Sequence, residues 1–68
     1  MKLKVNGEDR LVPDGMLLTE LLSSLGERFE GAGVAVAVNL AIVPRDHQES
    51  HVLKPGDQVD VVTAVGGG

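Results

Sequence analysis

The sequence predicts one α+β domain, in which a single helix packs on a mixed sheet of four to five strands. Three observations favour this class. Polar and apolar residues alternate near the start of the chain, leucines recur at helical spacing after it, and valine-rich alternating segments fill the second half. A chain of 68 residues has room for one small domain, which we place at residues 1–65, followed by a glycine tail at 66–68.

The first predicted element is a β-hairpin. Residues 2–6 alternate polar and apolar side chains, so Leu3 and Val5 point to the core. Asn6-Gly7 tolerates the positive φ that a tight hairpin turn requires. Residues 10–12 are then the returning strand.

The predicted helix follows the turn signal Pro13-Asp14-Gly15 and extends from Leu17 to Leu25. Its apolar residues recur in steps of three and four, which places them on one face that covers the sheet: Leu18, Leu21, Leu22 and Leu25. Gly26 is the predicted C-cap, because glycine readily adopts the left-handed conformation common there. Gly31-Ala32-Gly33 loosens the chain before the next strand.

Two more strands are predicted before residue 45. In the segment Val34 to Val38 valines alternate with alanines, so the valines fill the core and the alanines leave the other face flat. Asn39-Leu40-Ala41 is a turn. Ile42-Val43 is a short strand that Pro44 ends, because proline has no N–H to donate.

The last strand is predicted at residues 58–65, after a polar excursion at residues 46–51. Val52 and Leu53 return to the core, and Lys54-Pro55-Gly56-Asp57 forms a turn. The buried face of the strand carries Val59, Val61, Thr63 and Val65. The outer face carries Asp60, Val62 and Ala64.

Composition excludes several classes of function. The chain has no cysteine, which rules out disulfides, thiolate zinc sites and a catalytic thiol. Phe29 is the only aromatic residue, so no stacking platform for nucleic acid bases is present. The net charge of -4 opposes binding to phosphate backbones and anionic membranes, and the chain lacks a signal-peptide pattern and an apolar membrane span. We expect a cytoplasmic protein that binds neither nucleic acid nor membrane.

No internal cluster predicts an enzyme. His47 and His51 have the i, i+4 spacing of a metal-binding pair, but a solvated loop is favoured for this short polar segment. The acidic pair Glu8-Asp9 is placed at a hairpin tip and Glu27-Glu30 at a helix end, where solvated charge is expected. The final glycines precede no helix whose amides could hold a phosphate. We therefore expect no metal and no tightly bound cofactor.

Gly66, Gly67 and Gly68 follow the last predicted strand directly. Glycine has no Cβ, and three extended residues span roughly 10 Å, so this tail would fit a narrow channel in another protein. On composition alone, a frayed chain end is the favoured interpretation.

Four segments change that interpretation, because they resemble the ThiS family of sulfur carriers in thiamine biosynthesis. They are Val36-Ala37-Val38-Asn39, Ile42-Val43-Pro44-Arg45, Leu53 to Asp57, and Val59 to Gly68. The resemblance spans nearly the whole chain and implies a ubiquitin-like β-grasp fold. This chain departs from the family pattern at Leu17, where relatives often have a Ser or Thr N-cap, and near Gln48, where many have an aromatic residue.

The resemblance implies that Gly68 is the modified residue. A terminal carboxylate is ionised at neutral pH and is a poor electrophile, so it needs activation. A ThiF-like adenylating enzyme would use ATP to form an acyl adenylate, and a persulfide sulfur donor would convert it to a thiocarboxylate. A ThiG-like thiazole synthase would then take the sulfur, with Val65, Gly66 and Gly67 entering the partner active sites. The chain would be a cosubstrate of these enzymes and not an enzyme itself.

A partner-docking surface is also predicted beside the tail. It contains Asp57, Asp60, Val62 and Ala64, with Ala35 and Ala37 if their strand is a neighbour. Exposed apolar patches mark interaction sites, and the carboxylates would complement a basic partner. An equal alternative is that these small residues only satisfy strand packing.

Two other functions stay open. The chain could be a sulfur carrier of another pathway: a relative of the small subunit of molybdopterin synthase, or a carrier for tRNA thiolation or cysteine synthesis. The short length and the segment Ile42-Val43-Pro44-Arg45 favour the thiamine pathway. A ubiquitin-like module for conjugation or binding ranks last, because a pure binding domain has no need of a bare glycine end.

Overall fold

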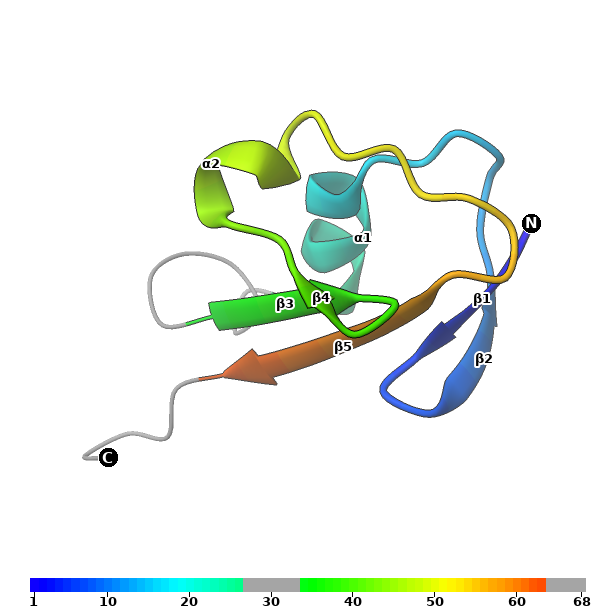
Figure 1. Ribbon diagram of the computed structural model, residues 1–68. Coiled ribbons are helices and arrows are strands. Elements are labelled where there is room, and N and C mark those ends of the chain that lie inside the picture. Colours follow the sequence, from blue (N-terminus) through cyan, green and yellow to red (C-terminus); the bar gives the residue numbers. More distant parts are fainter. Residues whose placement is uncertain (27–33, 64–68) are drawn as a thin grey trace.

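The computed structural model describes residues 1–26 and 34–63. In chain order its elements are β1 Lys2–Val5, β2 Glu8–Leu11, α1 Leu18–Leu25, β3 Val34–Val38, β4 Ala41–Ile42, α2 Arg45–Gln48 and β5 Gln58–Thr63. The strands form a five-stranded sheet in the order β2-β1-β5-β3-β4. Figure 1 shows α1 and α2 on the same side of this sheet. The predicted α+β class, with one main helix on a mixed sheet, is confirmed.

β1 and β5 lie side by side at the centre of the sheet and run parallel, with Lys4 opposite Gln58 and Val5 opposite Val59. The other pairs, β1 with β2, β3 with β5 and β3 with β4, are antiparallel. Parallel neighbours need a crossover connection, and the chain between β1 and β5 supplies it with α1. The sheet therefore has one face under the helix and one face that the described residues leave uncovered.

The core lies between α1 and the covered face of the sheet. Its buried apolar residues are Leu3, Val5, Leu18, Leu21, Leu22, Val36, Val38, Leu53, Val59 and Val61. All of them were predicted to be inward from strand alternation, helical spacing or return to the core. Each fully buried Leu or Val side chain contributes about 1.5–3 kcal/mol relative to exposure, so this cluster is the main source of stability.

The β1–β2 hairpin differs from the prediction in where its second strand begins. Asn6 and Gly7 have positive φ values of 49° and 84°, as expected for the turn. Asn6 and Gly7 form the whole two-residue turn, so β2 begins directly after it at Glu8 and not at Arg10. Glu8 and Asp9 are consequently strand residues rather than residues of the hairpin tip. The Asp9 carboxylate lies 3.4 Å from the Lys2 ammonium.

The ends of α1 follow the sequence with one correction. Leu17 is the N-cap residue and offers no hydroxyl cap; its own N–H donates to the Glu20 carboxylate at 2.8 Å, which is the N3 side-chain half of a capping box. Gly26 is the C-cap, with φ 120° and ψ 164°. The predicted left-handed helical conformation is therefore wrong for Gly26, although its positive φ still favours glycine. The predicted Gly31-Ala32-Gly33 loop lies outside the described residues.

The connection between β4 and β5 contains a short helix that the sequence did not predict. Residues 46–51 were expected to be irregular, but Arg45–Gln48 forms α2. Gln48 is buried, and its Nε2 donates to the carbonyl of Val43 at 3.2 Å. One apolar position was misassigned as well: Leu53 is buried, whereas Val52 is exposed. Adjacent residues of an extended segment face opposite sides, so only one of the two can reach the core.

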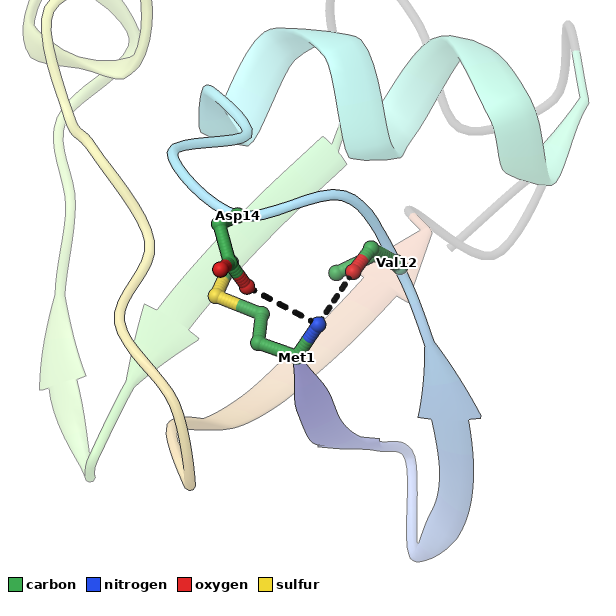
Figure 2. A network of polar contacts seen from close by, with 3 residues as sticks. All are labelled: Met1, Val12 and Asp14. Carbon is green, nitrogen blue, oxygen red and sulfur yellow. Dashed lines mark hydrogen bonds and ion pairs between the residues drawn. The ribbon is translucent and has the colours of Figure 1, made fainter.

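The N-terminus is fixed to the loop that precedes α1 (Figure 2). The α-ammonium group of Met1 donates to the carbonyl of Val12 and lies 3.0 Å from the Asp14 carboxylate. These contacts join the start of β1 to the end of the first hairpin. Within the two described ranges, no helix is both long and apolar enough to cross a membrane.

Candidate functional site

The strand that leads to the predicted tail is held on both sides. β5 pairs with β1 at two registered positions and with β3 at five, up to Thr63 opposite Val34. Ala64, Val65, Gly66, Gly67 and Gly68 lie outside the described residues. The position of Thr63, the last described residue before them, is therefore set by the central strand.

The outer face of β5 meets the outer faces of β3 and β4. Val62 lies opposite Ala35, and Asp60 lies opposite Ala37. Ala37 in turn lies opposite Ile42 on β4. Residues directly opposite in a sheet share a face, so these side chains form one surface, which we call the outer patch: Ala35, Ala37, Ile42, Asp60 and Val62. The patch lies on the side of the sheet away from α1.

The outer patch is largely apolar and accessible. Ile42 is 69% exposed and Val62 is 63% exposed. Ala35 and Ala37 lie on β3, the strand between β4 and β5, and their short side chains leave the middle of the patch flat. Its one charge is Asp60, which is half-buried and accepts a hydrogen bond from Gln58 Nε2 at 3.3 Å. Ala35 and Ala37 were predicted to join this surface if their strand neighboured the last strand, and the pairing of β3 with β5 makes them neighbours. Ile42 was missing from the predicted surface.

Asp57 does not belong to this surface. Its carboxylate is buried and accepts hydrogen bonds from Asn39 Nδ2 at 3.0 Å and from the Lys54 N–H at 2.8 Å. Asp57 precedes β5 in the same alternation phase as buried Val59, which turns its side chain away from the outer face. Its role is to hold the turn at residues 54–57, and the prediction of a docking carboxylate at Asp57 is wrong.

The β3–β4 turn carries another exposed apolar residue, Leu40. Asn39 and Leu40 both have positive φ, 52° and 70°. The Asn39 amide is engaged on both ends, because its Oδ1 accepts the Gln58 N–H at 3.0 Å while its Nδ2 donates to Asp57. Leu40 is almost fully exposed. The sequence assigned this segment to a turn but gave Leu40 no role, although a leucine in a tight hairpin turn was the available signal.

The histidines lie away from the outer patch. His47 is exposed on α2, and His51 is half-buried after it. Among residues 1–26 and 34–63, no three His, Cys, Asp or Glu side chains gather to hold a metal ion. Glu27 and Glu30, the second acidic pair considered, lie outside the described residues.

Comparison with known proteins identifies the family. The model of the ThiS family matches residues 3–68. The chain belongs to the ThiS family. The predicted membership of the ThiS family is confirmed. The sulfur carrier protein ThiS of Escherichia coli (strain K12) is 34% identical over 68 residues, which cover 100% of both chains.

Solved structures agree with the β-grasp fold implied by the ThiS resemblance. The crystal structure of a thiamine biosynthesis protein (ThiS) from Geobacter metallireducens matches with a TM-score of 0.82 and 33% identity, over 100% of both chains. A solution structure of a thiamine biosynthesis protein from the same organism matches with a TM-score of 0.78. The predicted ubiquitin-like β-grasp fold is thereby confirmed.

Two other relatives of this ThiS-family chain are much longer. Thiazole synthases of Paramagnetospirillum magneticum and Magnetococcus marinus are 38% and 41% identical to it over 68 residues. The match covers 100% of this chain and 20% of each of those proteins. The chain thus spans about one fifth of their length, and a segment similar to all of it forms part of a longer polypeptide in each.

Proposed function

We propose that this ThiS-family protein is a sulfur carrier for thiamine biosynthesis that carries sulfur on the carboxyl carbon of Gly68. The observation that carries the proposal is the family match, which extends through residue 68. End-to-end similarity to the sulfur carrier protein ThiS of Escherichia coli supports it. In this role the chain is a cosubstrate of other enzymes and not itself an enzyme.

The chemistry requires activation of the terminal carboxylate. An oxygen of that group attacks the α-phosphorus of ATP on a ThiF-like adenylating enzyme, and pyrophosphate leaves. The resulting acyl adenylate has a good leaving group, so a terminal persulfide sulfur attacks the carbonyl carbon and AMP departs. Reductive cleavage of the new S–S bond by a thiol then leaves the thiocarboxylate. This chain has no cysteine, so both the persulfide and the thiol must come from partner proteins or small thiols.

Glycine at positions 66 to 68 suits a group that must enter different active sites in turn. Without a Cβ, the backbone on either side of the reacting carbonyl approaches partner atoms closely. Val65, Gly66 and Gly67 are the residues that we propose to occupy the entry channels. ATP belongs to the adenylating enzyme, and this chain needs no cofactor of its own.

Thiazole synthase is the proposed sulfur acceptor. Two proteins of that name contain a segment similar to this whole chain. Joining two modules in one polypeptide raises their effective concentration for each other, which favours a carrier and the enzyme that it supplies. For the separate chain, the outer patch is the proposed contact surface, because its residues Asp60 and Val62 lie on β5, the strand that precedes the tail in the sequence.

The test is an intact-mass measurement after incubation with a ThiF-like enzyme, ATP and a persulfide donor. We expect the protein to gain the mass difference between one sulfur and one oxygen. Deletion of Gly67 and Gly68 should abolish that gain while leaving the thermal midpoint unchanged, because the core residues found within 1–26 and 34–63 all precede residue 62. Failure of the full chain to form an acyl adenylate with any such enzyme would contradict the proposal.

A further inference from the structure

The chain builds two hairpin turns of the same kind from different residues. In the β1–β2 turn the central pair is Asn6 and Gly7, with φ values of 49° and 84°. In the β3–β4 turn it is Asn39 and Leu40, with φ values of 52° and 70°. Asparagine and glycine adopt positive φ readily, whereas the Cβ of leucine crowds the backbone there. Leu40 therefore occupies the second central position of its turn, the position that Gly7 occupies in the β1–β2 turn.

Burial does not compensate for this backbone strain. Leu40 is 83% exposed, so its side chain gains little from packing within the domain. Asn39, by contrast, has a structural reason for its conformation, since its side chain links Gln58 and Asp57. A single exposed leucine is ordinary, but an exposed leucine in a strained turn stabilises neither the turn nor the core.

The hairpin that carries Leu40 has a second exposed apolar residue and no ionisable residue. Ile42, two residues further along the same hairpin, is 69% exposed and lies opposite Ala37. From Val34 to Val43 the chain contains no ionisable side chain, although 24% of all residues are charged. The β3–β4 hairpin, at one edge of the sheet, thus carries two exposed apolar side chains, and one of them, Ile42, belongs to the outer patch. We call Leu40 and Ile42 the edge pair.

We propose that the edge pair inserts into an apolar recess of thiazole synthase and sets the position from which the tail enters that enzyme. This inference rests on the proposed function and names a contact for the step in which sulfur is transferred to thiazole synthase. The occupant is chosen because relatives similar to the whole chain are themselves parts of thiazole synthases. Asp60, the only charge on the outer patch, calls for a basic side chain at the border of that recess.

The decisive variant is Leu40→Gly, because its effects on stability and on binding have opposite signs. Glycine relieves the strain at positive φ, so the thermal midpoint should stay the same or rise. Loss of the buried leucine contact should weaken affinity for thiazole synthase by at least about tenfold, measured by titration calorimetry with the separate proteins. Ile42→Thr, which keeps a β-branched residue in β4, should also weaken binding.

The matched control is Leu11→Ala. Leu11 is 85% exposed and lies on β2, the opposite edge strand of the sheet, so its truncation should leave the affinity unchanged. Sulfur loading by the adenylating enzyme is measured in parallel by intact mass. Leu40→Gly protein that loads sulfur normally but binds thiazole synthase weakly supports the inference.

Three results overturn it. Equal affinity of wild type and Leu40→Gly for thiazole synthase removes the edge pair from the interface and leaves the proposed function intact. Absence of binding by the wild-type protein contradicts both the edge-pair contact and the proposal that thiazole synthase is the sulfur acceptor. A Leu40→Gly defect confined to the adenylating enzyme, or to self-association in sedimentation runs, assigns the edge pair to that partner instead of thiazole synthase.

Discussion

The buried carboxylate of Asp57 joins two turns that are far apart in sequence. It accepts hydrogen bonds from Asn39 Nδ2 at 3.0 Å and from the Lys54 N–H at 2.8 Å. Asn39 Oδ1 in turn accepts the Gln58 N–H at 3.0 Å. A buried polar group is stable only when it is paired, and here every member has a partner. This network fixes where β5 begins relative to the β3–β4 turn.

Asp57→Ala should therefore destabilise the domain through the partners that it leaves unpaired. We expect the free energy of unfolding to fall by about 1–3 kcal/mol, measured by urea denaturation. Glu8→Ala is a suitable control, since Glu8 is exposed on β2 and its truncation should change the stability by less than about 0.5 kcal/mol. Equal effects of the two substitutions would show that the network contributes nothing.

Among the secondary-structure elements, α1 begins without a hydroxyl or carboxamide N-cap. The Glu20 carboxylate accepts the Leu17 N–H at 2.8 Å and also places negative charge in the first turn. Both effects stabilise a helix N-terminus, where backbone N–H groups lack partners. Glu20 thus stabilises the start of the helix through the N–H of Leu17 and through its charge, although it does not satisfy the N–H groups that an N-cap side chain would accept.

Glu20→Ala should lower the stability by about 0.5–1 kcal/mol, because the site is exposed and the bond is partly replaced by water. Glu20→Gln retains an acceptor oxygen and loses only the charge, so its effect should be smaller. Thermal unfolding followed by circular dichroism measures both. A Gln variant as unstable as the Ala variant would assign the whole effect to charge.

Elements with a buried face were predictable, and those without one were not. Val34–Val38 was predicted at both ends, because its valine and alanine alternation directly encodes its two faces. All four residues of β2 are exposed, so burial leaves no pattern that marks its start. The single turn of α2 has one buried residue, the polar Gln48, and hence no apolar periodicity to recognise.

The candidate site shows the same division. Alternation along β5 correctly put Val62 on the outer face, and the pairing of β3 with β5 added Ala35. Asp57 was misplaced because alternation was not extended back beyond the strand. Leu40 and Ile42 could not be assigned, since their exposure depends on the register and φ values of a hairpin, which residue types alone do not specify.

For the molecule as a whole, a small aliphatic core sets the stability. A domain of this size without disulfide or metal has a net stability on the order of 3–5 kcal/mol. Leu21 is fully buried at the centre of α1, between the helix and the sheet. The loss of one such side chain is comparable to the whole stability of the domain.

Leu21→Ala should therefore leave much of the protein unfolded at room temperature. Large-to-small substitutions at such sites cost about 2–5 kcal/mol, and we expect amide signals to collapse in nuclear magnetic resonance spectra. Leu11→Ala, at an exposed leucine, should keep the native spectrum. A folded Leu21→Ala protein with a normal thermal midpoint would disprove this account of the core.

The central position of β5 also bears on how the protein is made. The Val61 N–H donates to Asn6 Oδ1, 55 positions earlier in the chain, so contacts at the middle of the sheet wait for the last strand to be synthesised. A polypeptide that stops before Gln58 retains only the hairpins β1–β2 and β3–β4, and two-stranded hairpins are marginal in water. Translation that stops before Gln58 thus yields a product that lacks both the folded domain and residues 66–68.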